Sequence, residues 1–180
     1  MIVLSLDPGT THTGWALIES LIPRVVESGK DDNERVRDML SGPGIYDLIL
    51  IETMSGSAHM PFGVEKVEAV RWSGRFEEAA IPYPVKRISR ESIKATLLGK
   101  ANVKGADAAI RQLLIDRWAA RAGRPLDGKA AAVGTKASPG PLYGVKADAW
   151  AAIALWEAHN DGALSVEAER ERAAARRDAA

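Results

Sequence analysis

Short apolar runs of strand length recur along the first half of the chain. The first, at residues 2–6, is rich in leucine and β-branched residues and is followed by Asp7, Pro8 and Gly9. Because proline cannot donate to a strand ladder and glycine turns without steric cost, this strand should end at Asp7. Similar runs predict further strands at 15–18, 25–26, 46–51 and 85–88.

Between and after these strands, apolar residues recur at helical spacing. The periodicity predicts helices at 33–40, 64–80, from Ser89, 102–121 and 146–156. This alternation is typical of an α/β fold, and 180 residues suit one domain. We assign residues 1–160 to that domain and 161–180 to a charged C-terminal helix or tail. Residues 123–145 lack periodicity and are rich in glycine and proline, so they predict a long flexible loop that serves as a lid or binding segment.

Two of the predicted strands end in an acidic residue. Asp7 closes the first run and Glu52 closes the fourth, while Asp148 lies near the start of an alanine-rich helix. Asp7 could simply cap a turn, but three acids that converge would repel one another and need divalent cations. Oxygen ligands select Mg²⁺ or Mn²⁺, and two such ions can hydrolyse a phosphodiester. The three acids therefore predict a two-metal site.

The charge is unevenly distributed, although the chain carries 24 basic and 24 acidic residues in total. Residues 86–148 hold 13 basic and 5 acidic side chains, which is typical of a surface that binds a polyanion. A solvated face is the alternative. The candidates for contact with DNA are Lys86, Arg87, Arg90, Lys94, Lys100 and Lys104. Phe62 could stack on a base, or it could equally pack back on the core.

Composition narrows the function classes. The absence of cysteine excludes disulfides and thiolate metal sites. No apolar run approaches the roughly 18 residues of a membrane helix, and no signal peptide precedes the first strand, so we expect a cytoplasmic protein.

The D-x-G-T-T pattern at Asp7 also occurs in the sugar-kinase and actin group of ATPases. Those enzymes bind nucleotide between two such domains, so this length argues against a nucleotide cofactor.

Several motifs, taken in order, resemble the RuvC-type Holliday junction resolvases, especially the short versions of bacteriophages. They are LDPGTTHTGW, LILIET, EKVEAVRWSGRFEEA, PVKRISRESIKATLLGKANVKGADA and KADAWAAIAL, and they cover most of residues 1–158. The resemblance implies a ribonuclease H-like fold with a five-stranded mixed sheet flanked by helices. It also implies a Mg²⁺- or Mn²⁺-dependent endonuclease with Asp7, Glu52 and Asp148 as ligands, four-way junction DNA as substrate, and a host or bacterial cytoplasmic location.

A homodimer is part of this expectation, because a four-way junction presents two equivalent strands for cleavage. We expect the interface on the helix at 65–80, with Trp72 and Phe76 as anchors. The alternative is that their shared face is core, as such a stripe ordinarily is.

The chain departs from the family pattern at Val145, where the family carries Asp or His. If the last helix begins near Lys146, position 145 points toward the metals, and Val145→Asp should tighten metal binding. Two other functions stay open. One is a less selective nuclease that cuts flaps, forks or hybrids, and the other is a junction-binding module without catalysis.

Overall fold

The computed structural model describes residues 1–54, 63–146 and 148–162. These form a mixed sheet in the order β3-β2-β1-β4-β5. Strand β2 runs antiparallel to both of its neighbours, β1 and β3, whereas β4 and β5 run parallel to β1. The bounds are β1 Ile2–Pro8, β2 His12–Glu19, β3 Arg24–Asp32, β4 Leu48–Thr53 and β5 Val85–Ser89. The predicted α/β fold with a five-stranded mixed sheet is confirmed.

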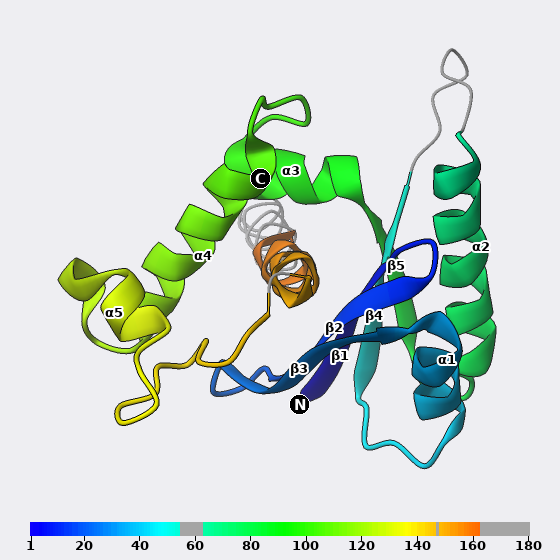
Figure 1. Cartoon of the computed structure of the whole chain (residues 1–180), viewed down its shortest axis with the longest axis horizontal. Coiled ribbons are helices and arrows are strands. Elements are labelled where there is room, and N and C mark those ends of the chain that lie inside the picture. Colours follow the sequence, from blue (N-terminus) through cyan, green and yellow to red (C-terminus); the bar gives the residue numbers. More distant parts are fainter. Residues whose placement is uncertain (55–62, 147, 163–180) are drawn as a thin grey trace, which may run out of the picture.

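Helices cover both faces of the sheet (Figure 1). On one face lie α1 (Asn33–Ser41) and α2 (Val64–Ala79). On the other lie α3 (Arg90–Leu98), α4 (Ala106–Arg121) and the last helix at 149–162. The last helix sits between the sheet and α4 (Figure 1). No helix in the described residues is long and apolar enough to cross a membrane.

Each central strand supplies both cores, because successive side chains point to opposite faces of a sheet. In β1, Leu4 and Leu6 pack toward α1 and α2, whereas Val3 packs toward the last helix. In β4, Ile49 and Ile51 face α1 and α2, and Leu50 faces the last helix. The strands are therefore apolar on both sides, as expected for a sheet that is covered by helices on both faces.

A buried carboxylate joins the last helix to α4. Glu157 is fully buried, and its carboxylate accepts hydrogen bonds from Arg117 at 3.1 Å and from Arg121. The Arg121 guanidinium also lies over the rings of Trp118 and Trp156. Because losing one partner of a buried ion pair is costly, this cluster holds the last helix in place beside the sheet.

The expectation of a segment without secondary structure at 123–145 is wrong. It contains a 3-10 helix η1 (Pro125–Asp127), a short helix α5 (Lys129–Ala132) and a bridge between Gly134 and Pro139. Its apolar residues Ala131, Ala132 and Leu142 are buried in the same core as the last helix. These residues are too few and too irregularly spaced to give a periodic signal, which is why the pattern missed them.

The predicted dimer anchors are also placed differently from the expectation. Trp72 and Phe76 lie on the inner side of α2, with rings 5.6 Å apart, and both are buried against β1 and β4. Their exposed fractions are 8% and 0%, so they have no area to offer a second chain. The four-residue spacing marks one face of a helix, but that face is the core-facing one.

Candidate active site

Strand alternation places Asp7 and Glu52 on the same face of the sheet. Asp7 follows Val3 and Ser5 at two-residue intervals, and Glu52 follows Leu50, so both face the last helix. The parallel register pairs Leu6 with Ile51, which puts the two acids side by side one residue further on. They stand at the carboxyl ends of parallel strands, where open α/β sheets commonly bind ligands.

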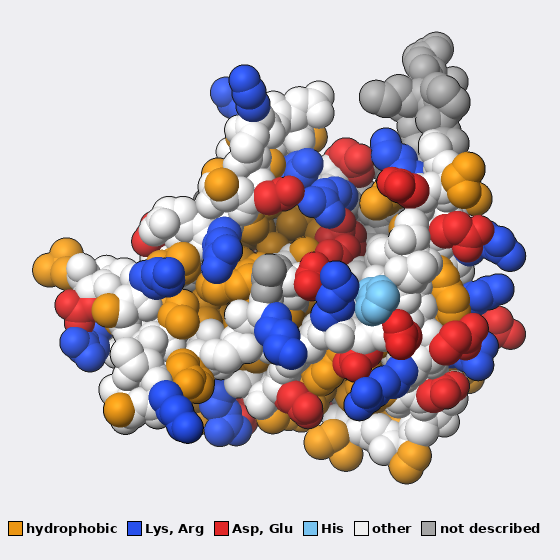
Figure 2. Space-filling view, in the orientation of Figure 1, with side chains coloured by type: hydrophobic (Ala, Val, Ile, Leu, Met, Phe, Trp, Pro, Cys, Tyr) orange, Lys and Arg blue, Asp and Glu red, His pale blue; other side chains and the backbone are white. Residues whose placement is uncertain are grey.

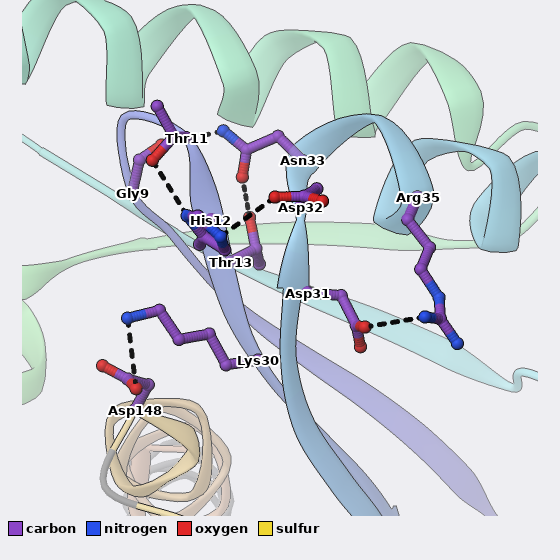
Figure 3. A network of polar contacts seen from close by, with 10 residues as sticks. All are labelled: Gly9, Thr11, His12, Thr13, Lys30, Asp31, Asp32, Asn33, Arg35 and Asp148. Carbon is purple, nitrogen blue, oxygen red and sulfur yellow. Dashed lines mark hydrogen bonds and ion pairs between the residues drawn. The ribbon is translucent and has the colours of Figure 1, made fainter.

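Asp148 reaches the same place from the turn that precedes the last helix, which begins at residue 149. Its backbone packs directly on β2, where a Cβ added to Gly14 would overlap the Asp148 carbonyl oxygen. Its carboxylate is 48% exposed and lies 3.3 Å from the Lys30 ammonium (Figure 3). Asp148 is therefore not on the buried helix face that its sequence context indicates, and its partner is a lysine of β3.

The turn after Asp7 is tied to the start of α1 by a buried amide. Asn33 accepts a 2.7 Å hydrogen bond from the Thr13 hydroxyl and donates to the Gly9 carbonyl at 3.1 Å (Figure 3). His12 lies 2.9 Å from Asp32 in the same network. These bonds hold the β1–β2 turn, and with it the end of β1 that carries Asp7.

All three acids line one cavity of about 470 Å³ between the sheet, α3, α4 and the last helix. Figure 2 shows a hollow floored by hydrophobic side chains, with acidic groups at one side and basic groups around it. Asp7 and Asp148 also border a smaller, polar hollow of about 220 Å³, which is lined by the β1–β2 turn and Lys30. Asp7 and Asp148 thus border both hollows, whereas Glu52 lines only the larger one.

Arg90 provides the counter-charge inside the larger cavity. Its guanidinium lies 3.2 Å from the Glu52 carboxylate and 3.1 Å from Asp107, in the first turn of α4. Glu52 is 5% exposed, whereas Asp107 is 78% exposed. Arg90 is therefore fastened to the acids and is not a free cation for DNA, contrary to its prediction as a DNA contact.

The acids are energetically strained without a metal. Burial raises the pKa of Glu52 to about 8, the Asp7 charge adds to this, and Arg90 opposes it. Burial likewise raises the pKa of Asp7, which Arg90 lowers and Asp148 raises. Burial thus opposes the charged form of both carboxylates, and a cation stronger than one arginine would offset this cost.

The donor set fits Mg²⁺ or Mn²⁺, since Asp7, Glu52 and Asp148 offer only carboxylate oxygens to one cavity. Nevertheless, no three His, Asp or Glu side chains within the described ranges are close enough together to hold one ion. Two of the three carboxylates have cationic partners instead: Lys30 lies beside Asp148, and Arg90 lies beside Glu52. Metal binding would require both carboxylates to leave these partners.

The other predicted DNA contacts divide into two groups. Arg87 contacts β4 and α2: its guanidinium lies 3.1 Å from the hydroxyl of Thr53 on β4 and 3.4 Å from the carboxylate of Glu77 on α2. Lys86 points to the opposite face and lies 3.2 Å from the His159 ring. By contrast, Lys94 lines the cavity, and Lys100 and Lys104 lie exposed in the α3–α4 loop, which projects from the molecule (Figure 1). Phe62 lies outside the described residues.

Val145 is not among the residues that line the cavity of the acids. It is half-buried and packs against the core of the last helix, three residues before Asp148 and outside the helix. The expectation that Val145→Asp would tighten metal binding depended on a helix that began near Lys146, whereas the helix begins at residue 149, so that premise does not hold. A carboxylate at 145 would instead meet apolar side chains.

Three residues of the site were missed by sequence reasoning. Lys30 pairs with Gly14 in the β2–β3 register, so its place beside Asp148 follows once that register is known. Asp107 lies in the second turn of the predicted helix at 102–121, and nothing in its local sequence indicates that it pairs with Arg90. Arg111 gave no sequence signal for its position over Trp150, where its guanidinium lies 4.8 Å from the ring centre.

Comparison with known proteins finds similarity in structure only. No protein-family model and no curated protein sequence matches the chain. Among solved structures, a Thermus thermophilus RuvC structure is 19% identical with a TM-score of 0.55, covering 92% of this chain and 96% of its own. T. thermophilus RuvC in complex with a Holliday junction substrate is 17% identical with a TM-score of 0.57, covering 91% and 94%. The chain therefore has the RuvC fold, and the resemblance indicated by its motifs is confirmed at the level of the fold.

Proposed function

We propose that this protein is a metal-dependent, structure-selective DNA endonuclease that cuts four-way junctions. The observation that carries the proposal is the convergence of Asp7, Glu52 and Asp148, from two strand ends and a helix start, on one cavity bordered by cations. The RuvC fold supports it, since one structure of that fold is a complex with a Holliday junction substrate.

In this proposal Asp7, Glu52 and Asp148 hold Mg²⁺ or Mn²⁺, with two ions per site. When bound, the ions supply a nucleophilic water and neutralise charge on the phosphate. Arg90 releases Glu52 and keeps its bond to Asp107, and Lys30 releases Asp148 toward the polar hollow. Lys94 and the exposed Lys100 and Lys104 hold the DNA backbone on the side of α3 and α4.

The decisive experiment measures cleavage of a labelled four-way junction in Mg²⁺ and in Mn²⁺. Wild-type protein should cut it, and Asp7→Asn, Glu52→Gln and Asp148→Asn should each reduce the rate more than about 100-fold, beyond the usual effect of an outer-shell residue. Junction binding should persist in all three, because the lysines bind the phosphates. Asp38→Asn, an exposed acid of α1, is the matched control and should leave cleavage unchanged.

Substrate comparison separates this proposal from its alternatives. Faster cleavage of a four-way junction than of a flap or a linear duplex supports junction selectivity, and equal rates indicate a less selective nuclease. Binding without any cleavage would indicate a junction-binding module, which the ion-paired state of Glu52 and Asp148 also allows.

A further inference from the structure

The larger cavity joins two kinds of wall. Asp7, Glu52 and Asp148 lie at one end. The apolar residues of the lining, called here the apolar wall, come from α3, α4 and the last helix: Ile93, Ile110, Leu114, Trp150, Ala151 and Ala154. Arg90 and the exposed Asp107 also line the cavity. A volume of about 470 Å³ is in the range of small-ligand pockets, which are roughly 300–1,000 Å³. Metal binding by the acids leaves the apolar wall without a role.

A cationic rim borders the apolar wall. Lys94 of α3 and Arg111 of α4 both line the cavity. The Arg111 guanidinium covers the ring of Trp150, with 4.8 Å between the guanidinium carbon and the ring centre. Guanidinium planes and aromatic rings are the groups on which proteins stack single bases.

We propose that the apolar wall receives one unstacked base of the DNA strand whose phosphate lies at the acids. The inference rests on the proposed function. A nucleotide carries a charged phosphate at one end and a flat, largely apolar base at the other. The cavity has the same polarity, because a cation-binding acid cluster is continuous with an apolar wall under a basic rim.

This pocket gives a physical source of selectivity for branched DNA. Taking a base out of a continuous duplex costs its pairing and stacking energy, and the cost is smallest where the base is already unpaired or distorted. A base beside a branch point enters the pocket at lower cost than one within a linear duplex. The pocket would therefore favour branch points without reading their sequence.

Ala108 allows a test from an exposed position. It lies on α4, is exposed and lines the cavity, so Ala108→Trp would fill the pocket without disturbing the core. Its neighbour Ala109 is equally exposed on the same helix but is not part of the cavity lining, so Ala109→Trp is the matched control.

The experiment places 2-aminopurine at successive positions near the branch of a four-way junction and replaces Mg²⁺ by Ca²⁺ to prevent cleavage. Wild-type protein and Ala109→Trp should change the fluorescence at one position, and Ala108→Trp should abolish that change. Ala108→Trp should weaken junction binding on the order of tenfold, the usual loss for one stacked base, and should lower junction cleavage in Mg²⁺ with it, whereas Ala109→Trp should leave both unchanged.

The outcomes are distinct. If wild-type protein binds and cuts the junction but no 2-aminopurine position responds, the base pocket is refuted and the nuclease proposal stands. If Ala108→Trp behaves as Ala109→Trp, the pocket is likewise refuted. If Ala108→Trp alone changes the oligomeric state in light scattering, the apolar wall seats a second chain instead. Absence of junction binding and cleavage in wild-type protein overturns the proposed function itself.

Discussion

At the scale of single residues, Glu52 is a carboxylate whose charge is opposed by burial. It is nearly fully buried, it adjoins Asp7, and one arginine provides its counter-charge. Its pKa of about 8 in the folded protein compares with 4.5 as the ordinary value. Between these values the folded state holds a proton that the unfolded chain lacks. The metal-free protein therefore loses stability as pH rises through this window.

Glu52→Gln tests this reasoning. In the presence of a chelator, wild-type protein should lose unfolding free energy between about pH 5 and pH 8, by an amount of order a few kcal/mol. The variant should lose less, because an amide does not ionise, so the two differ most at high pH. Urea unfolding across pH provides the measurement, and Glu68→Gln on the surface of α2 is the control. Parallel curves for wild type and Glu52→Gln would show that Glu52 ionises without cost.

The basic residues differ in whether their charge is available to contact a DNA phosphate. Lys94→Ala or Lys104→Ala should weaken junction binding and lower the log–log salt slope by roughly one unit for each phosphate that the protein no longer binds. Arg90→Gln should leave the slope unchanged, because its guanidinium keeps its bond to Asp107 when it releases Glu52. Binding titrations at several salt concentrations measure this, with Lys66→Ala on α2 as the control. A lower slope for Arg90→Gln would mean that DNA draws Arg90 away from the acids.

At the scale of elements, the site depends on how closely the last helix approaches β2. Gly14 has no side chain, and the backbone of Asp148 occupies the space that a Cβ would take. The buried Glu157 holds the same helix to α4 from its other side. The position of Asp148 thus follows from two contacts, neither of which involves its own side chain.

Gly14→Ala should displace Asp148 and reduce cleavage more than about 100-fold, since misplacement by 1 Å can cost that much. The protein should remain folded, because the contact lies at the start of the helix. Gly74→Ala is the control: Gly74 lies within α2 with open space around it, so the substitution should be neutral or stabilise by about 0.5–1 kcal/mol. Junction cleavage and thermal unfolding measure both effects. Full activity of Gly14→Ala would show that the helix can shift without loss.

At the scale of the whole molecule, one chain supplies one site, while a four-way junction presents two strands for cleavage. The proposed homodimer therefore needs a surface other than Trp72 and Phe76. The outer side of α2 offers Val64 and Val67, which are 81% and 42% exposed. The helix α2 lies on the sheet face opposite to α3 and α4 (Figure 1). A dimer formed through α2 would therefore leave the cavity of the acids open in each of the two chains.

Val67→Glu should convert the dimer to a monomer at micromolar concentration, because it places charge in the apolar contact. Light scattering measures the mass, and junction binding by the monomer should weaken. Leu126→Glu is the control, since Leu126 is 99% exposed on η1 at the other side of the molecule. A monomeric wild-type protein, with and without junction, would refute the dimer.

The sequence by itself determined the strands, most helices and the two strand-end acids, because period-two and period-3.6 patterns are local. Asp7 and Glu52 could be paired from that pattern alone, and Ser89 caps α3 as expected, its hydroxyl accepting the Ser92 amide at 3.1 Å. Local periodicity marks the apolar face of α2, but it does not show whether that face meets the sheet or a second chain. It also could not find order in 123–145, where single buried residues replace a repeat.

Only the tertiary structure decided which charges meet. Lys30 reaches Asp148 across more than a hundred residues, and Arg90 joins Glu52 to Asp107 across three elements. These pairs turn a predicted DNA contact into the counter-charge of the site. They depend on the packing of β3 and α4 around the last helix, and a charge in the sequence does not specify its partner. The same packing created the apolar wall beside the acids, since its residues come from three helices that the chain brings together only on folding.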